Sequence, residues 1–336
     1  MDANPGQRPC ALGWRTEPSG WVSRVRLQGL LAIPLALGAL GLGYGAQSLS
    51  SRPQVGQESA LLEAFMAAPP PAADTHQSAQ ELRQLRAQRS ANGLAEPSAG
   101  SPVDLEIRVA LLAASQEPNL SATGRWQLVG RGGQLLERGQ PGQLVNLDLF
   151  RRTAPEAWLQ SDGAALVVNG NPYAGRIRIV NSGGSLSVIN HLPLETYIQS
   201  VVGSEMPSSW SIEALKAQAV AARSYALAHM ARPANRYWHL GDNTRWQAYR
   251  GLEATTPRTR QATASTAGLI LSYQGAIVES LYAATRAITQ EAHGHLGASM
   301  SQHGAQELAQ QGMRYNAILG SYYQGASLAR LRSGSR

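Results

Sequence analysis

Glu205 is the residue of this sequence whose surroundings best suit acid catalysis. It lies in the run Gly203-Ser204-Glu205-Met206-Pro207, just past the predicted end of a helix. The negative end of the helix dipole disfavours a second negative charge there, and partial burial beside Met206 and Trp210 would act in the same direction. A carboxyl group that stays protonated near neutral pH can protonate a leaving oxygen. The alternative is that Glu205 only accepts hydrogen bonds in a turn between two helices. The spacing alone does not decide between a general acid and this structural role.

The other residues with reactive side chains do not predict a metal site. His293, His295 and His303 invite a zinc hypothesis, but two histidines one residue apart are no metal site by themselves and no fourth ligand is evident. The only cysteine is Cys10, which excludes a disulfide framework and a four-thiolate site. We therefore predict that the protein uses no metal and no other cofactor.

The chain is basic, but its basic residues do not cluster. Its 336 residues include 29 Lys and Arg against 22 Asp and Glu, which gives a formal net charge of +7. Nearly all of the basic residues are arginines scattered singly, and Lys216 is the only lysine. Because no zinc-finger spacing or aromatic-basic segment accompanies them, we predict no nucleic-acid partner.

The first hundred residues predict export and a linker rather than a folded domain. Residues 27–46 carry no charge and are about long enough to cross a bilayer as a helix. Arginines precede this stretch and none follows until Arg52, which places residues 1–26 in the cytoplasm and the main domain outside. A cleaved signal peptide is the alternative, since the apolar run ends in small residues. Residues 47–102 are rich in Ser, Gln, Pro and Ala and predict a disordered linker, so we expect a protein of the cell envelope, anchored or secreted.

A folded domain is predicted over residues 103–328, and its first half is rich in β-structure. Apolar and polar residues alternate over 103–111, which is the period-two pattern of a half-buried strand. The dipeptide Asn169-Gly170 between two apolar runs predicts a hairpin. The other strands are expected at 126–129, 144–150, 166–168, 176–180 and 186–189.

Helices are predicted after His191. Pro193 suits the first turn of a helix that ends near Gly203, and Ser211 is a plausible N-cap of an alanine-rich helix that runs to about Met230. Further elements are expected as a helix over 258–268, a strand pair over 269–273 and 277–282, and one or two helices over 301–323. The fold class predicted is α+β, with a β-rich N-terminal half packed on an Ala-rich helical segment with further strands.

Several runs of the second half closely resemble the stage II sporulation protein D and amidase-enhancer family. They are Leu192-Pro193-Leu194-Glu195-Thr196-Tyr197, Gly203-Ser204-Glu205-Met206-Pro207 and residues 213–226, together with the tail segments 293–295, 299–305 and 322–325. The block over 192–226 is long and rich in identical residue types, and the resemblance covers roughly residues 105–328.

The resemblance implies a peptidoglycan lytic transglycosylase. In the sporulation branch of the family a single glutamate protonates the glycosidic oxygen between muramic acid and glucosamine, and the sugar's own hydroxymethyl oxygen closes on the anomeric carbon. No second carboxylate is required, unlike in ordinary glycosidases. The family's catalytic glutamate falls on Glu205. The side chains expected to bind the glycan strand are Gln218, Arg223, Tyr225, His295, Ser301 and Gln302, and the aromatic residues that could stack on sugars are Trp210, Tyr225, Trp238 and Trp246.

The chain departs from the family after Leu281-Tyr282. The resemblance predicts a Ser-Gly-Gly segment and several dozen residues with further strands, which help to form one wall of the family's cleft. Here residues 283–292 lead directly to His293. Another branch of the family enhances a separate cell-wall amidase. The alternative function is therefore that of a non-catalytic envelope protein that binds glycan or stimulates such an amidase.

Overall fold

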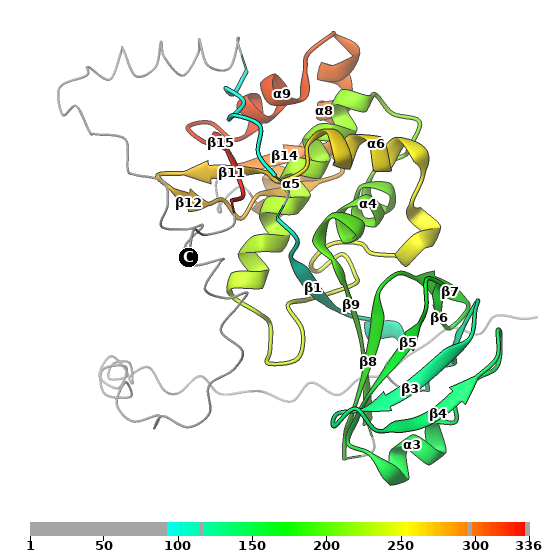
Figure 1. Ribbon diagram of the computed structural model, residues 1–336. Helices are drawn as coiled ribbons and strands as arrows, with labels where there is room; N and C mark the ends of the chain where they lie inside the picture. The colour runs from blue at the N-terminus through cyan, green and yellow to red at the C-terminus, as the bar shows by residue number, and fades with distance from the viewer. Residues whose placement is uncertain (1–92, 102, 115–116, 184, 294–297, 333–336) are drawn as a thin grey trace, which may run out of the picture. The chain divides into compact units, whose positions relative to one another are not determined.

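The computed structural model describes residues 93–332, with gaps at 102, 115–116, 184 and 294–297. This part of the chain is a mixed α+β structure whose strands dominate up to residue 193 and whose helices follow, as the sequence predicted (Figure 1). The predicted membrane segment 27–46, the N-terminal residues 1–26 and the linker up to residue 92 lie outside the described residues. Within the described residues, no helix is long and apolar enough to cross a membrane.

A seven-stranded sheet forms the core of the first half. Its strands follow the order β10-β1-β9-β8-β5-β3-β4 and are antiparallel except for the parallel pair β1 and β10. Their bounds are β1 Glu106–Ala110, β3 Trp126–Gly130, β4 Leu135–Gly139, β5 Glu156–Ser161, β8 Arg176–Ser182, β9 Ser185–Pro193 and β10 Leu240–Gly241. Ile107 and Val109 of β1 are fully buried, as the alternating pattern predicted.

A smaller sheet contains the hairpin predicted from Asn169-Gly170. Strands β6 (Leu166–Val168) and β7 (Asn171–Tyr173) pair across this turn, and β2 (Leu120–Ala122) pairs with β6. Both turn residues have positive φ angles, 50° at Asn169 and 85° at Gly170, a conformation that asparagine and glycine adopt more readily than other residues.

One predicted strand is a helix. Residues 144–150 were expected to form a strand, but Leu147–Thr153 is helix α3. The side chain of its N-cap, Asn146, accepts a hydrogen bond from the backbone N–H of Leu149, and Asp148 lies in the first turn, where a negative charge is favourable. The prediction failed because the apolar spacing was given more weight than these helix-start signals.

Helix α4 (Leu194–Glu205) leads directly out of β9 and carries Glu205 as its last residue. Gly203 and Pro207 were expected to bound its end, and it ends at Glu205, between them. A Cβ on Gly203 would lie 1.9 Å from the carbonyl oxygen of Ala254 in the short helix η2 (Gly251–Ala254). Glycine is therefore required here because two backbones approach closely, and not because the helix stops.

Replacing Gly203 with alanine should destabilise the protein by about 1–3 kcal/mol, because α4 and η2 must move apart. The measurement is urea unfolding followed by tryptophan fluorescence. Gly132→Ala is the matched control, since the only atoms near its added Cβ belong to the flexible side chain of Gln134. Equal stability of Gly203→Ala and Gly132→Ala would show that the α4–η2 contact relaxes without cost.

Helix α5 (Ile212–Ala231) is the centre of the second half (Figure 1). Its N-cap is Ser211, as predicted, and the side-chain oxygen accepts a hydrogen bond from the N–H of Glu213. The alanines let other elements pack closely around it, and all of the following contact it: α4, α6 (Pro257–Ser265), β11 (Leu269–Tyr273), α8 (Gln302–Gln310) and α9 (Tyr315–Tyr322). Their buried side chains and the sheet's apolar face belong to one continuous hydrophobic cluster.

The strands of the second half pair differently from the prediction. The turn at Gln274 and Gly275 joins β11 to β12 (Ala276–Ile277), and β15 (Ser327–Arg330) pairs with the other edge of β11. Residues 281 and 282, expected in the same hairpin, instead belong to β13 (Leu281–Ala283), which runs parallel to β14 (Ser299–Ser301). Helix α7 (Arg286–His293) lies between these two strands in the sequence. This pairing brings residues 281–283 next to the start of α8.

Residues 93–101, which their composition assigned to the linker, lie against the C-terminal helices and strands. Leu94 is buried, and its backbone N–H donates to the backbone oxygen of Asn316. The side-chain amide of Asn316 donates in turn to the carbonyl oxygen of Leu94. The carbonyl oxygen of Ser98 accepts a hydrogen bond from Arg330. Residues 93–101 therefore pack against the domain that was predicted to begin at residue 103.

Candidate functional site

Glu205 is held by donors from two segments that are distant in the sequence. Its Oε1 accepts a hydrogen bond of 2.8 Å from the backbone N–H of Ala248, in the segment between β10 and η2. Its Oε2 accepts one of 3.2 Å from the side-chain amide of Gln302, the first residue of α8. The side chain is half-buried. Each carboxyl oxygen therefore has a fixed partner.

Burial raises the pKa of Glu205 above its ordinary value. The hydrogen bonds from Ala248 and Gln302 favour the charged form and lower the pKa, but they offset the effect of burial only in part. Its place at the C-terminal end of α4 acts in the same direction as burial. A carboxyl group with a raised pKa is suited to donate a proton.

Three polar side chains form a hydrogen-bonded row beside Glu205. The hydroxyl of Tyr197 donates to Oε1 of Gln247 over 3.0 Å, and Nε2 of Gln247 donates to the hydroxyl oxygen of Tyr282 over 2.8 Å. Gln247 directly precedes Ala248, whose N–H binds Glu205. Burial raises the pKa values of Tyr197 and Tyr282, and the negative charge of Glu205 raises them further by a smaller amount. Glu205 and this row therefore form one polar cluster.

A pocket of about 460 Å³ lies at the start of α8. It is lined by Thr285, Arg286, Ala287, Ser301, His303, Gly304 and Glu307. Ser301 and His303 flank Gln302 in the sequence, so the pocket lies one residue from a hydrogen-bond partner of Glu205. The ring of Trp210 packs edge-on against His303, with the ring centroids 4.9 Å apart. Hydroxyl, imidazole and guanidinium groups in such a pocket suit a polar, oxygen-rich ligand such as a sugar.

The structure brings three of the predicted binding residues to this cluster. Gln302 bonds to Glu205 directly. Ser301 is buried as the N-cap of α8, where its hydroxyl accepts a hydrogen bond from the N–H of Gly304. The ring of Tyr225 packs against that of Tyr282, with centroids 6.4 Å apart.

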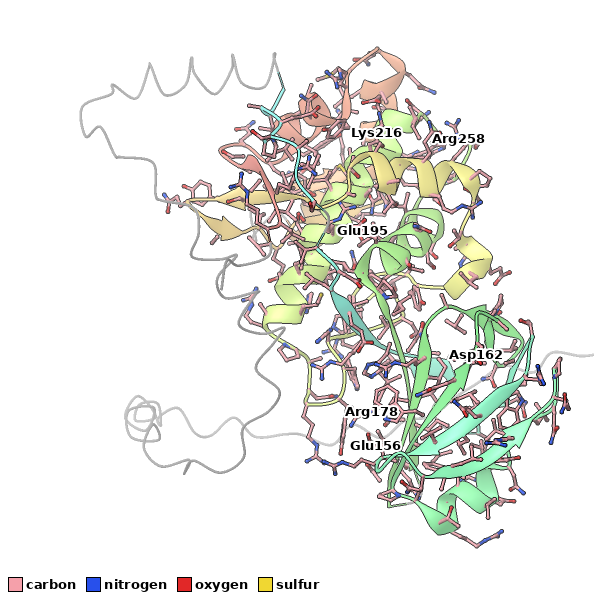
Figure 2. The ribbon with its side chains drawn as sticks, in the orientation of Figure 1. Glu156, Asp162, Arg178, Glu195, Lys216 and Arg258 are labelled. Atoms are coloured by element: carbon pink, nitrogen blue, oxygen red, sulfur yellow. The ribbon has the colours of Figure 1, made fainter. Side chains whose placement is uncertain are left out.

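Arg223 was predicted to bind sugar, but it lies in the core between α4, α5 and β11. Its side chain is 0% exposed, and its Nε and Nη2 donate to the two carboxylate oxygens of Glu195 over 2.8 and 2.7 Å. Its Nη1 donates to the carbonyl oxygen of Leu269. Figure 2 labels Glu195 among the helices of the second half. Because Arg223 is fully buried, it cannot contact a ligand at the surface. Its role is structural, since its ion pair with Glu195 and its bond to Leu269 join α4, α5 and β11.

The structure does not bring the remaining predicted residues to the hydrogen bonds of Glu205 described above. Gln218 is fully buried on α5, and neither atom of its amide has a hydrogen-bond partner in the part of the chain that the structure describes. His295 lies outside the described residues. Trp238 and Trp246 pack edge-to-face on each other, with centroids 5.5 Å apart. Across the described residues, no group of three or more His, Cys, Asp or Glu side chains could hold a metal ion.

The sequence analysis missed Gln247, Ala248 and Tyr282. Gln247 and Ala248 lie between the predicted helices, where the sequence analysis named only aromatic residues. Gln247 is nevertheless flanked by apolar and aromatic residues, which is a sign of burial, and it is fully buried. The contribution of Ala248 is a backbone N–H, for which a sequence gives no signal.

Comparison with known proteins supports the resemblance seen in the sequence. Residues 182–273 match the family model described as Stage II sporulation protein. An uncharacterized protein of Brachyspira hyodysenteriae is 36% identical over 124 residues, which cover 37% of this chain and 33% of that protein.

Two relatives with functional names come from Bacillus subtilis. Its amidase enhancer is 33% identical over 102 residues, which are 30% of this chain and 14% of the enhancer. Its stage II sporulation protein D is 33% identical over 112 residues, which are 29% of this chain and 33% of that protein. The similarity therefore spans a third or less of the length of each of these relatives.

Proposed function

We propose that this chain is a peptidoglycan lytic transglycosylase of the cell envelope, with Glu205 as general acid. The proposal is supported by the match of residues 182–273 to the family model described as Stage II sporulation protein. The observation that carries the proposal is the half-buried carboxyl of Glu205, which has a raised pKa and is held by the N–H of Ala248 and the side-chain amide of Gln302. The substrate is the glycan strand, and the main domain acts outside the cytoplasm.

The proposed reaction needs one carboxyl group. The protonated Glu205 gives its proton to the glycosidic oxygen as the bond between that oxygen and the anomeric carbon breaks. The hydroxymethyl oxygen of the same sugar then bonds to the anomeric carbon and returns its proton to the Glu205 carboxylate. No water is consumed, and the enzyme ends in its starting protonation state. Gln302 and the N–H of Ala248 stabilise the carboxylate between the two steps.

The pH dependence of cleavage should follow the protonation of Glu205. Activity should be highest below the pKa of Glu205 and fall as the pH rises through it, because only the protonated form is an acid. Gln302→Leu removes a hydrogen bond that lowers this pKa, so its alkaline limb should lie at higher pH than that of the wild type. The measurement is the initial rate of glycan cleavage by both proteins across the pH range. A limb displaced to lower pH in Gln302→Leu would contradict the assignment.

The proposal is tested by incubating the purified full chain with isolated glycan strands. We expect new soluble fragments that end in anhydro-muramic acid. Strands that remain intact over a wide range of protein concentration and pH would refute catalysis.

A second function has its own supporting observation. Only residues 284–298 separate β13 from β14, so the chain lacks the extra segment that the family resemblance leads us to expect there. One relative is named an amidase enhancer. If the short connection leaves the pocket unable to cleave, the protein would bind glycan and stimulate a cell-wall amidase. It would then release no fragments by itself but accelerate the release of stem peptides by an added amidase.

A further inference from the structure

The pocket at the start of α8 has charged groups in its lining that the proposed reaction does not use. Arg286, the first residue of α7, and Glu307 of α8 line it together with His303 and smaller side chains. All three of these side chains are exposed, so a ligand that enters the pocket can reach them. The sequence analysis gave no role to Arg286 or Glu307, and neither bonds to Glu205.

The guanidinium of Arg286 lies along the first turns of α8. Its Nε is 3.2 Å from the position that a Cβ on Gly304 would take, and its Nη2 is 3.5 Å from Oε2 of Glu307. Glycine at position 304 therefore leaves room for the guanidinium against the helix backbone. The cationic group is held at the wall of the pocket while most of its side chain stays exposed.

The contact with Glu307 leaves Arg286 able to bind a second anion. At 3.5 Å it is longer than the hydrogen bonds of a tight arginine–carboxylate pair, which measure about 2.7–2.9 Å, and both partners are exposed. Exposed ion pairs contribute little to stability, because water and salt screen them. A guanidinium carries five N–H donors in a plane and binds a carboxylate with two of them. Arg286 can therefore bind an anionic ligand without giving up a strong ion pair.

Side chains, and not the backbone of α8, must make the contacts with such a ligand. The backbone N–H of His303 already donates to a carbonyl oxygen, and the N–H of Gly304 donates to the hydroxyl of Ser301. The imidazole of His303 adds an N–H donor to the same lining as Arg286. The positive end of the α8 dipole also favours a negative charge here. Guanidinium and imidazole donors at a helix start suit a carboxylate better than an uncharged sugar hydroxyl.

We infer that this pocket binds a carboxylate group of the peptidoglycan strand, with the guanidinium of Arg286 as its main partner. The inference rests on the proposed glycan substrate, but it holds equally for a protein that binds glycan without cleaving it. The carboxylate has two possible sources. Muramic acid carries one on its lactyl group when no peptide is attached, and an attached peptide converts that group to an amide but brings carboxylates of its own. The other sugar, N-acetylglucosamine, has none.

The test is the affinity of the full chain for three kinds of soluble fragment, measured by calorimetry. They are muramic acid-containing fragments without peptides, the same fragments with peptides, and N-acetylglucosamine oligomers. Arg286→Gln should bind the carboxylate-bearing fragment that the wild type prefers about 10-fold more weakly, as expected for lost charge-assisted hydrogen bonds at an exposed site. It should bind the uncharged oligomers as tightly as the wild type does and keep the same melting temperature. The fragment that the wild type prefers identifies the lactyl group or the peptide as the source of the carboxylate.

Arg314→Gln is the matched control. The side chain of Arg314 is 69% exposed, against 68% for Arg286, and it also pairs with a glutamate, but it does not line the pocket. The variant loses the same charge from the protein as Arg286→Gln. It should bind all three kinds of fragment like the wild type.

Three results would overturn the inference. Wild-type affinity of Arg286→Gln for carboxylate-bearing fragments would show that the guanidinium does not contact the ligand. An equal loss of affinity for the uncharged oligomers would show that no carboxylate is recognised. Equal losses in Arg286→Gln and Arg314→Gln would assign the effect to the overall charge of the protein. A wild-type protein that shows the expected pattern but cleaves no strands would support the inference and refute only the proposed catalysis, whereas one that binds no fragment would refute both.

Discussion

Glu205→Gln should lower the rate of glycan cleavage by about 10²- to 10⁴-fold, the range that a general acid contributes. Glutamine has the same shape as the protonated glutamic acid, and its side-chain oxygen can still accept the N–H of Ala248. It has no acidic proton to give to the glycosidic oxygen. Because the change also removes a buried ionisable group, the folded protein should be at least as stable as the wild type.

The measurement is the initial rate of fragment release by the purified full chain. Glu253→Gln is the matched control, since it makes the same chemical change at an exposed carboxylate in η2. The control should retain full activity. Equal rates in Glu205→Gln and the wild type would remove Glu205 from the mechanism, whatever the control shows.

Glu195→Ala should destabilise the protein by about 3–5 kcal/mol, because it leaves the guanidinium of Arg223 buried without its counter-charge. Arg223 is 0% exposed, and its guanidinium donates to both carboxylate oxygens of Glu195. The same carboxylate also accepts a hydrogen bond from the N–H of Gly268. The remaining partners of Arg223, such as the carbonyl oxygen of Leu269, do not carry a negative charge. The measurement is the free energy of unfolding from urea titration, followed by tryptophan fluorescence.

A double variant separates the loss of this ion pair from simple loss of packing. Arg223→Met with Glu195→Leu removes both charges and keeps most of the side-chain volume, so it should be more stable than Glu195→Ala alone. If the double variant is as unstable as the single one, packing around these side chains and not the buried charge dominates. If Glu195→Ala costs less than 1 kcal/mol, water reaches the Arg223 guanidinium despite its burial.

Local patterns were sufficient to predict the elements around the site. Pro193 predicted the start of α4, and Ser211 marked the start of α5. The period-two alternation around Ile107 and Val109 predicted β1. These signals are carried by residues within a few positions of each other, and the structure confirms them.

The arrangement of the site depends on contacts between distant parts of the chain, which the patterns do not contain. Residues 281–283 have the composition of a hairpin strand, but their partner is β14. Gly203 looks like a helix stop but is required by the carbonyl group of Ala254. Arg223 looks like a surface ligand for sugar, but its partner Glu195 lies 28 positions earlier in the chain. In each case a tertiary contact decided the outcome over the local signal.

The mass of the product tests the central claim most directly. The full chain should be incubated with glycan strands in water labelled with heavy oxygen, and the new ends analysed by mass spectrometry. A single acid at Glu205 with the substrate's own hydroxymethyl oxygen as nucleophile predicts anhydro ends that are lighter by one water and carry no label. Reducing ends that carry the heavy oxygen would mean that water is the nucleophile, and would contradict the one-carboxyl mechanism.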